Sequence, residues 1–361
     1  MSAPAPAPDA GTAVPSGPDA VTPPPTGPRG PDSGGFRATL RSAHLVHRGA
    51  VRIAGVAVLL ATVVTFGLYL WTRLAPDRER CDFRDGDMLV KDEDLSRLSE
   101  CYDSAFGYQS ALSWYRLLVT DLDLWVLVPV VLVAAFVAGP LIARELESGT
   151  FRLAWTQAET PRRWLTGRLV LGCAVVIVAG TVCVGLIRFA RTTSVEQGML
   201  WSHESVFPTL GPVLVAYLVL AVALGALVGL LLRRVILSMA AALLGTGAVL
   251  VGLAQLRPYL WPHETYVRKG EGEGTFPPGN SYQFDYGLLT LDGDRVPHTW
   301  LNCPGRESTE CLRGQGYSGR WIDYHPASHF WPLQLVETGI VLALAALAVF
   351  VSLRVLRKIA P

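Results

Sequence analysis

Apolar residues in this chain fall into long runs that polar segments separate. Six runs are each close to the ~20 residues that an α-helix rising ~1.5 Å per residue needs to cross a hydrocarbon core of ~30 Å. They cover residues 53–71, 124–142, 169–187, 213–232, 235–254 and 333–353. The pattern predicts an all-α polytopic membrane protein with six transmembrane helices, in a domain that covers residues 53–358.

The overall composition supports a membrane protein. Half of the 361 residues are hydrophobic and 17% are charged, whereas a soluble domain carries roughly a quarter charged residues. The low lysine content, with abundant Ala, Gly, Pro and Arg, is typical of a GC-rich bacterial genome.

Two segments of different character precede the first apolar run. Residues 1–35 are rich in proline and nearly free of bulky apolar side chains, which predicts a disordered cytoplasmic tail. Residues 36–52 place apolar and basic side chains on different sides of a helix. We expect either an amphipathic helix in the membrane interface, facing anionic head groups, or a basic flank that sets topology.

The distribution of Lys and Arg predicts the orientation, because short cytoplasmic loops are enriched in both. Basic residues precede the first run, lie between the second and third and between the fourth and fifth, and follow the last. These segments, and with them both termini, are predicted to be cytoplasmic. The Arg233–Arg234 turn is too short for anything but an antiparallel hairpin. The segments 72–123 and 255–332 contain more acidic than basic residues and are predicted to be long outer loops.

Cysteine positions give an independent test of this orientation. Two cysteines lie in each predicted outer loop, and two more lie in the third apolar run. Disulfides persist in oxidising compartments outside the cytoplasm, so the pattern favours one disulfide within each loop, with reduced cysteines as the alternative. The candidate disulfide residues are Cys81, Cys101, Cys303 and Cys311.

The chain offers little catalytic chemistry of its own. It contains no Gly-Lys pair, so it lacks the lysine that a nucleotide-binding P-loop requires, and any ATP chemistry must come from a partner. All seven histidines lie outside the six runs, which leaves no intramembrane base for hydrolysis. His325 and His329 are four residues apart, but the two prolines of HPASHFWP favour a membrane-entry loop over a metal site. We therefore predict no enzyme, no bound cofactor and no metal.

Glu337 stands out as an ionisable residue inside a predicted span. A charge at the membrane centre costs at least ~2.5 kcal/mol on the most permissive scale, and Glu337 lies about 6 Å from the start of its span at ~1.5 Å per residue. It either hydrogen-bonds neighbouring helices near an outer gate or points to interfacial water. So few intramembrane charges argue against a proton-coupled carrier.

A charged segment, residues 143–168, separates the second and third spans. It combines opposite charges at helical spacings with interleaved apolar residues, and Pro161 suits the start of a helix. One interpretation is a solvated loop that only sets topology. We favour a short helix that docks on another protein. Its candidate docking residues are Arg144, Glu145, Leu146, Glu147, Arg152 and Trp155.

Two stretches of the chain resemble a known family. The run GPLIARELESGTFRLAWTQ, followed by PRRWLTGRLVLG, is similar to the loop between the second and third spans of bacterial ATP-binding-cassette permease subunits of the type-two exporter class. YHPASHFWPLQLVE is similar to the approach to the last helix in that family. Phe151 departs from the pattern, because a histidine is common there, and residues 158–160 replace a more basic stretch.

The resemblance implies a permease that exports a substrate with ATP and Mg²⁺ bound by partner cassette ATPase subunits, which residues 143–168 would contact. It implies a second permease subunit, identical or different, a multi-pass location in the bacterial plasma membrane among its lipids, and no nucleic-acid partner. The alternative hypothesis is a membrane scaffold or sensor whose disulfide-closed outer loops bind an extracellular ligand. No motif indicates the substrate.

Overall fold

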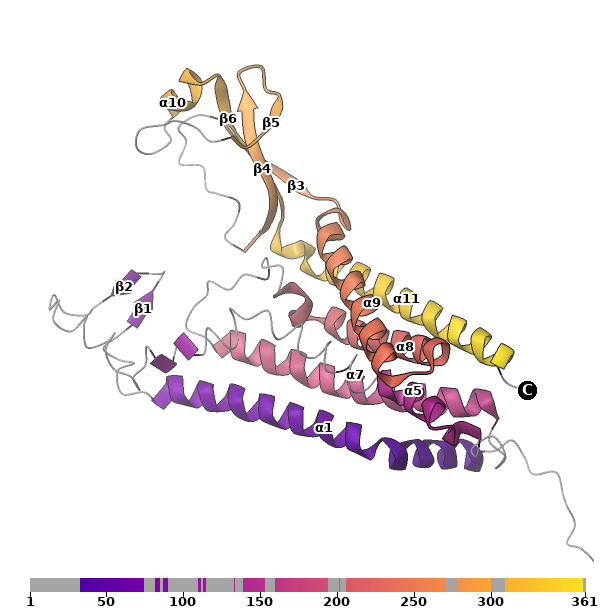
Figure 1. The fold of residues 1–361 in the computed structure, drawn as a ribbon. Helices are drawn as coiled ribbons and strands as arrows, with labels where there is room; N and C mark the ends of the chain where they lie inside the picture. The colour runs from indigo at the N-terminus through magenta and orange to yellow at the C-terminus, as the bar shows by residue number, and fades with distance from the viewer. Residues whose placement is uncertain are drawn as a thin grey trace, which may run out of the picture.

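The computed structural model is a bundle of long helices with a β-sheet beyond one end of it (Figure 1). It describes residues 33–74, 82–84, 87–89, 110–111, 113–114, 133, 139–152, 160–193, 201, 206–269, 277, 280–299 and 309–359. The α-helices are α1 (Ser33–Leu74), α5 (Gly139–Glu147), α7 (Pro161–Thr193), α8 (Pro212–Leu232), α9 (Val235–Leu256), α10 (Thr309–Gly314) and α11 (Phe330–Ile359). Short 3-10 helices are η4 (Phe207–Leu210), η5 (Arg257–Tyr259) and η6 (Ala327–His329). The strands are β1 (Asp82–Arg84), β2 (Asp87–Leu89), β3 (Glu264–Lys269), β4 (Tyr282–Thr290), β5 (Arg295–Pro297) and β6 (Tyr317–His325).

Within the described residues, five helices are long and apolar enough to cross a membrane. They cover Gly55–Leu74, Pro161–Phe189, Pro212–Leu232, Val235–Tyr259 and Ala327–Ile359. These five match the first, third, fourth, fifth and sixth predicted spans, and the chain is a multi-pass membrane protein. The second predicted span, 124–142, lies outside the described residues except for 133 and 139–142, so the count of six stays a prediction.

The first span is part of a longer helix than the sequence predicted. α1 runs without interruption over 42 residues, and the predicted interfacial segment 36–52 forms its first part. A separate interfacial helix is therefore absent from this described segment. A separate interfacial helix and the first part of one continuous helix have the same spacing of apolar and basic residues. Periodicity therefore could not distinguish the two. The predicted disordered tail lies outside the described residues, except for its last three positions.

α8 is surrounded by other helices. It contacts α5, α7, α9 and α11, and its sequence is apolar on every side, as expected for a helix without a solvent face. Gly229 lets α5 approach closely, because a Cβ there would lie 3.2 Å from the backbone nitrogen of Ala143. At its end Arg233 adopts a left-handed conformation with φ 54°. α9 begins two residues later, which confirms the predicted antiparallel hairpin.

The predicted outer loop 255–332 contains a folded sheet, which corrects the all-α prediction. Four antiparallel strands pair in the order β3-β6-β4-β5. Burial alternates along β6, where Gly319, Trp321, Asp323 and His325 are buried and the residues between them are partly exposed. The strands are 3–9 residues long, so a search for apolar runs of ~20 residues could not detect them.

Aromatic rings pack the sheet against the helices. The rings of Trp201 and Phe330, at the start of α11, pack in a T-shaped arrangement with centroids 5.8 Å apart. The same indole lies 6.1 Å from the ring of Tyr282 at the start of β4, and its Nε1 donates a hydrogen bond of 3.0 Å to the carbonyl of Asn280. The sheet thus packs against the end of the helix bundle through these aromatic contacts.

Replacing Gly229 with valine tests the close packing of α8 on α5. The added Cβ would press on backbone atoms of Ala143, and overpacking of this kind costs ~1–3 kcal/mol. We expect the unfolding temperature of the purified protein in detergent to fall by about 5 °C. Gly247→Val in α9 is the matched control, because nothing lies within 4 Å of a Cβ there. Equal shifts for both variants would contradict the packing argument.

Candidate functional site

The candidate site lies where α5 ends and α7 begins. Gly149, with φ 73°, terminates the helical run of α5, because a left-handed residue there costs glycine little. α7 begins at Pro161, the position that proline favours, since its missing N–H has no helical partner. The Thr160 side chain accepts a hydrogen bond of 3.4 Å from the backbone N–H of Arg163, which caps this helix start.

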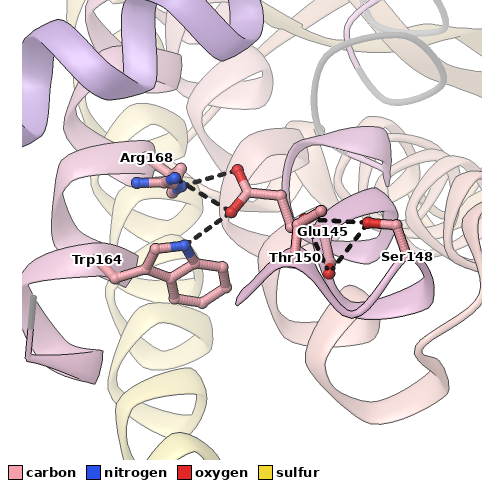
Figure 2. A network of polar contacts seen from close by, with 5 residues as sticks. All are labelled: Glu145, Ser148, Thr150, Trp164 and Arg168. Carbon is pink, nitrogen blue, oxygen red and sulfur yellow. Dashed lines mark hydrogen bonds and ion pairs between the residues drawn. The ribbon is translucent and has the colours of Figure 1, made fainter. Parts of the chain in front are cut away.

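A buried ion pair joins the two helices. Arg168 of α7 donates from Nε to Oε1 of Glu145 at 3.0 Å and from Nη2 to Oε2 at 3.1 Å, and Trp164 donates from Nε1 to Oε2 at 2.7 Å (Figure 2). The guanidinium carbon lies 5.2 Å from the centroid of the Trp164 ring. The exposed fractions are 7% for Glu145, 3% for Arg168 and 0% for Trp164. We call these three residues the Glu145 cluster.

The geometry of the Glu145 cluster makes it a rigid joint. A planar guanidinium binds both oxygens of a carboxylate in one orientation, and hydrogen bonds between ionised groups are stronger than neutral ones. Trp164 and Arg168 are four residues apart on α7, so both point from one face of that helix toward Glu145. The cluster therefore fixes the position of α5 relative to α7.

A second acidic residue of α5 reaches a different helix. Oε2 of Glu147 accepts a hydrogen bond of 2.9 Å from the backbone N–H of Val235, the first residue of α9. A carboxylate at a helix N-terminus satisfies a free N–H group and complements the helix dipole. Ser148 and Thr150 fold back on α5, since each hydroxyl lies 3.4 Å from the Glu145 carbonyl (Figure 2). α5 is thus bonded to both α7 and α9.

The six predicted docking residues divide into three groups. Arg144, Glu147 and Arg152 are exposed. Glu145 and Leu146 are buried inside the chain, so their contacts within this subunit are structural. Trp155 lies outside the described residues. The exposed surface of α5 and residues 148–152 is therefore basic at Arg144 and Arg152 and acidic at Glu147.

A second buried ion pair lies near the other end of the bundle. Glu337 of α11 accepts hydrogen bonds of 2.8 Å and 3.2 Å from Nε and Nη2 of Arg257, and one of 2.8 Å from the Tyr217 hydroxyl of α8. The Arg257 guanidinium lies 4.5 Å from the centroid of the Phe207 ring. Glu337 and Tyr217 are 0% exposed and Arg257 is 2% exposed. The sequence left open whether Glu337 hydrogen-bonds neighbouring helices or points to interfacial water. In the structure it is hydrogen-bonded to neighbouring elements.

Sequence reasoning missed both partners of Glu337. The predicted fifth span ended at residue 254, which placed Arg257 in an outer loop. The helical path continues through η5 to Tyr259, so Arg257 enters the bundle. A buried carboxylate needs a cation as its partner. Arg257 lies only three residues beyond the predicted fifth span, so it was a candidate partner for Glu337.

The described cysteines divide between bonded and free. Cys311 is disulfide-bonded, whereas Cys173 and Cys183 of α7 are free. Cys81, Cys101 and Cys303 lie outside the described residues, so the pairing within each loop stays a prediction. Among the described side chains, no group of three or more His, Cys, Asp or Glu residues is arranged to hold a metal ion.

The sequence of this chain matches the model of a known protein family. A family model described as ABC-2 membrane transporter related matches residues 51–257, more than half of the chain. The matched region contains α5, the Glu145 cluster, α8, α9 and Arg257. No curated protein and no solved structure matches the chain.

Replacing Glu145 with leucine tests the buried ion pair. The change leaves the Arg168 guanidinium buried without its counter-charge, which costs ~3–5 kcal/mol. We expect a large drop in the unfolding temperature of the purified protein in detergent, measured by tryptophan fluorescence.

The double variant Glu145→Leu/Arg168→Met is the informative control for this experiment. Replacing both partners of a buried pair by apolar residues of similar volume is often neutral. The double variant should therefore regain the stability that the unpaired guanidinium costs, whereas the hydrogen bond from Trp164 Nε1 to Glu145 is lost in both variants. If it unfolds at the temperature of the single variant or lower, the ion pair is not what joins α5 to α7.

Proposed function

Because the chain belongs to the ABC-2 membrane transporter related family, we propose that it is the permease subunit of an ATP-binding-cassette exporter, which moves a substrate across the membrane with ATP hydrolysed by partner subunits. The observation that carries the proposal is the architecture of α5. It presents an exposed charged surface and is bonded through buried or capping contacts to α7 and α9. A short helix of this kind can receive a force from outside and pass it to several spans.

The contacts of α5 suggest how ATP hydrolysis would be coupled to transport. Closure of two cassette ATPases would push on the surface formed by Arg144, Glu147 and Arg152. The Glu145 cluster would carry this movement to α7, and the contacts of α5 with α8 and α9 would carry it to the hairpin. The spans would then change between inward-facing and outward-facing arrangements by rigid-body movement.

The partners and location follow from the same proposal. The chain lacks a Gly-Lys pair, so ATP and Mg²⁺ would be bound by the cassette ATPase, and a second permease subunit would complete the pathway. We place the protein in a bacterial plasma membrane, with both termini and α5 in the cytoplasm and the β3–β6 sheet outside. The disulfide at Cys311 agrees with an oxidising outer compartment. The family match favours this function over a membrane scaffold or sensor.

The double charge reversal Arg144→Glu/Arg152→Glu tests the docking surface. Both side chains are exposed, so the variant should keep its unfolding temperature. If the surface binds a cassette ATPase, reversal of two charges in a contact should reduce the bound ATPase at least about tenfold. The measurement is co-purification from membranes, together with ATPase stimulation by the purified permease.

The matched control is Arg357→Glu/Lys358→Glu. These residues are exposed at the end of α11, on the side also predicted to be cytoplasmic, and their reversal changes the net charge by the same amount. This variant should bind and stimulate the ATPase as the unmodified protein does. Unchanged binding by the Arg144→Glu/Arg152→Glu variant would refute the docking assignment.

A further inference from the structure

Two histidines connect the sheet to the helix bundle. His325 is the last residue of β6 and is 0% exposed, while His329 ends η6 and leads into α11. Their Nδ1 atoms are 3.1 Å apart. On the opposite side of its ring, Nε2 of His325 lies 2.9 Å from the carbonyl oxygen of Pro258 in η5. A single imidazole thus contacts both the end of the α9 segment and the start of the α11 segment.

These contacts determine where the protons lie. A carbonyl oxygen only accepts hydrogen bonds, so Nε2 of His325 carries a hydrogen and donates it to Pro258. Nδ1 of the neutral His325 ring then has a free lone pair, and it accepts a hydrogen bond from Nδ1–H of His329. When both rings are neutral, the connection therefore has the hydrogen of His325 on Nε2 and that of His329 on Nδ1.

The surroundings of His325 do not favour a positive charge. Its ring stacks on Tyr282 and on Phe284, with centroids 6.2 Å and 5.4 Å away. From η5, Arg257 lies next to Pro258 but is paired with Glu337. Among the described residues, the other titratable or charged groups around it are His329 before α11, His263 and Glu264 at β3, and Asp323 on β6, which lies beside His263.

The nearby carboxylates already have partners. Asp323 accepts a hydrogen bond from Thr265 and lies 3.6 Å from both Arg295 and His263. Glu264 is exposed and accepts a hydrogen bond of 2.9 Å from the Tyr324 hydroxyl. A proton added to His325 would therefore place a charge in a buried aromatic setting where each neighbouring carboxylate is engaged.

The balance of these effects lowers the pKa of His325. Burial is the largest cause, the neighbouring His329 and His263 lower the pKa further, and the Pro258 hydrogen bond and Glu264 oppose this. A histidine whose pKa is lower in the folded state stabilises the fold at pH values above its ordinary pKa of ~6.5. This stabilisation is lost as the pH falls below ~6.5 toward the folded-state pKa.

We propose that His325 and His329 form an acid-sensitive latch that holds the β3–β6 sheet on the helix bundle. One added proton can remain in the bridge, because His329 can change tautomer and accept a hydrogen bond from protonated His325. A second proton puts N–H groups on both Nδ1 atoms, which then face each other across 3.1 Å with two like charges. The bond between the rings is lost, and the sheet is released at this point.

The latch would give the outer part of the protein a response to acid. In the orientation proposed above, the pair faces the outer compartment, so acidification outside the cell would loosen the sheet. That placement rests on the proposed function. The latch itself rests on the contacts of His325 and is tested without a transport assay.

Hydrogen exchange of the purified full-length protein in lipid nanodiscs tests the latch. Exchange is measured by mass spectrometry at several pH values between about 7.5 and 5.5, with a chelator present so that no metal ion bridges the two rings. After correction for intrinsic rates, amides of β6 and η5 should exchange about tenfold faster at the acid end, because two protons favour the open form. The logarithm of the corrected rate should change by more than one unit per pH unit in the steepest region.

Three variants make the outcome decisive. His325→Gln removes the titrating ring, so exchange of β6 should be fast at every pH and lose its acid dependence. His329→Phe leaves His325 in place without a shared proton, and its acid dependence should fall to one proton at most. His298→Gln is the matched control, because His298 is an exposed histidine just after β5 and outside the pair. It should follow the unmodified protein.

Two results would overturn the latch. One is corrected exchange of β6 and η5 that changes less than about twofold over this pH range. The other is acid dependence that persists in His325→Gln, or a two-proton slope that persists in His329→Phe, since a group outside the pair would then be responsible. These results leave the docking experiment on α5 unaffected.

Discussion

Glu145 and Glu337 are both buried among helices, where a carboxylate without a cation would cost several kcal/mol, and each is held by an arginine and an aromatic donor. Arg168 and Trp164 bind Glu145, whereas Arg257 and Tyr217 bind Glu337. In both clusters the guanidinium also lies against an aromatic ring. The need to pair these two charges determines which helices meet, α5 with α7 in one cluster and α8, η5 and α11 in the other.

α9 connects the two ends of the bundle. Its first residue, Val235, is bonded to Glu147 of α5. Its last turn continues into η5, where Arg257 is bonded to Glu337 and the Pro258 carbonyl contacts His325 of the sheet. In the proposed function, a helix held at both ends would move as a rigid element, and movement of α5 would reach the β3–β6 sheet through these contacts. These contacts form a continuous chain of bonded groups from α5 to the sheet, along which the proposed coupling would run.

The sequence predicted elements well and long-range pairs poorly. Apolar runs located the five described spans, and the Arg233–Arg234 turn located the hairpin. The partner of Glu145 lies 23 residues away on another helix, and that of Glu337 lies 80 residues away. Such pairs depend on which helices are neighbours in the bundle, and this cannot be read from a single sequence. The sheet escaped detection because its strands are short and partly polar, and α1 was divided because periodicity cannot separate one long helix from two.

The order of charges in α5 explains how one short helix can both hold and dock. Glu145 and Glu147 are two residues apart, so they project from different sides of the helix. Glu145 points inward to Arg168, whereas Glu147 stays exposed and caps α9. Arg144 is exposed directly beside the buried Glu145. In the proposed function, a force applied at Arg144 would act one residue from an anchored ion pair and would move α7 with α5, whereas a solvated loop would absorb the same force by bending.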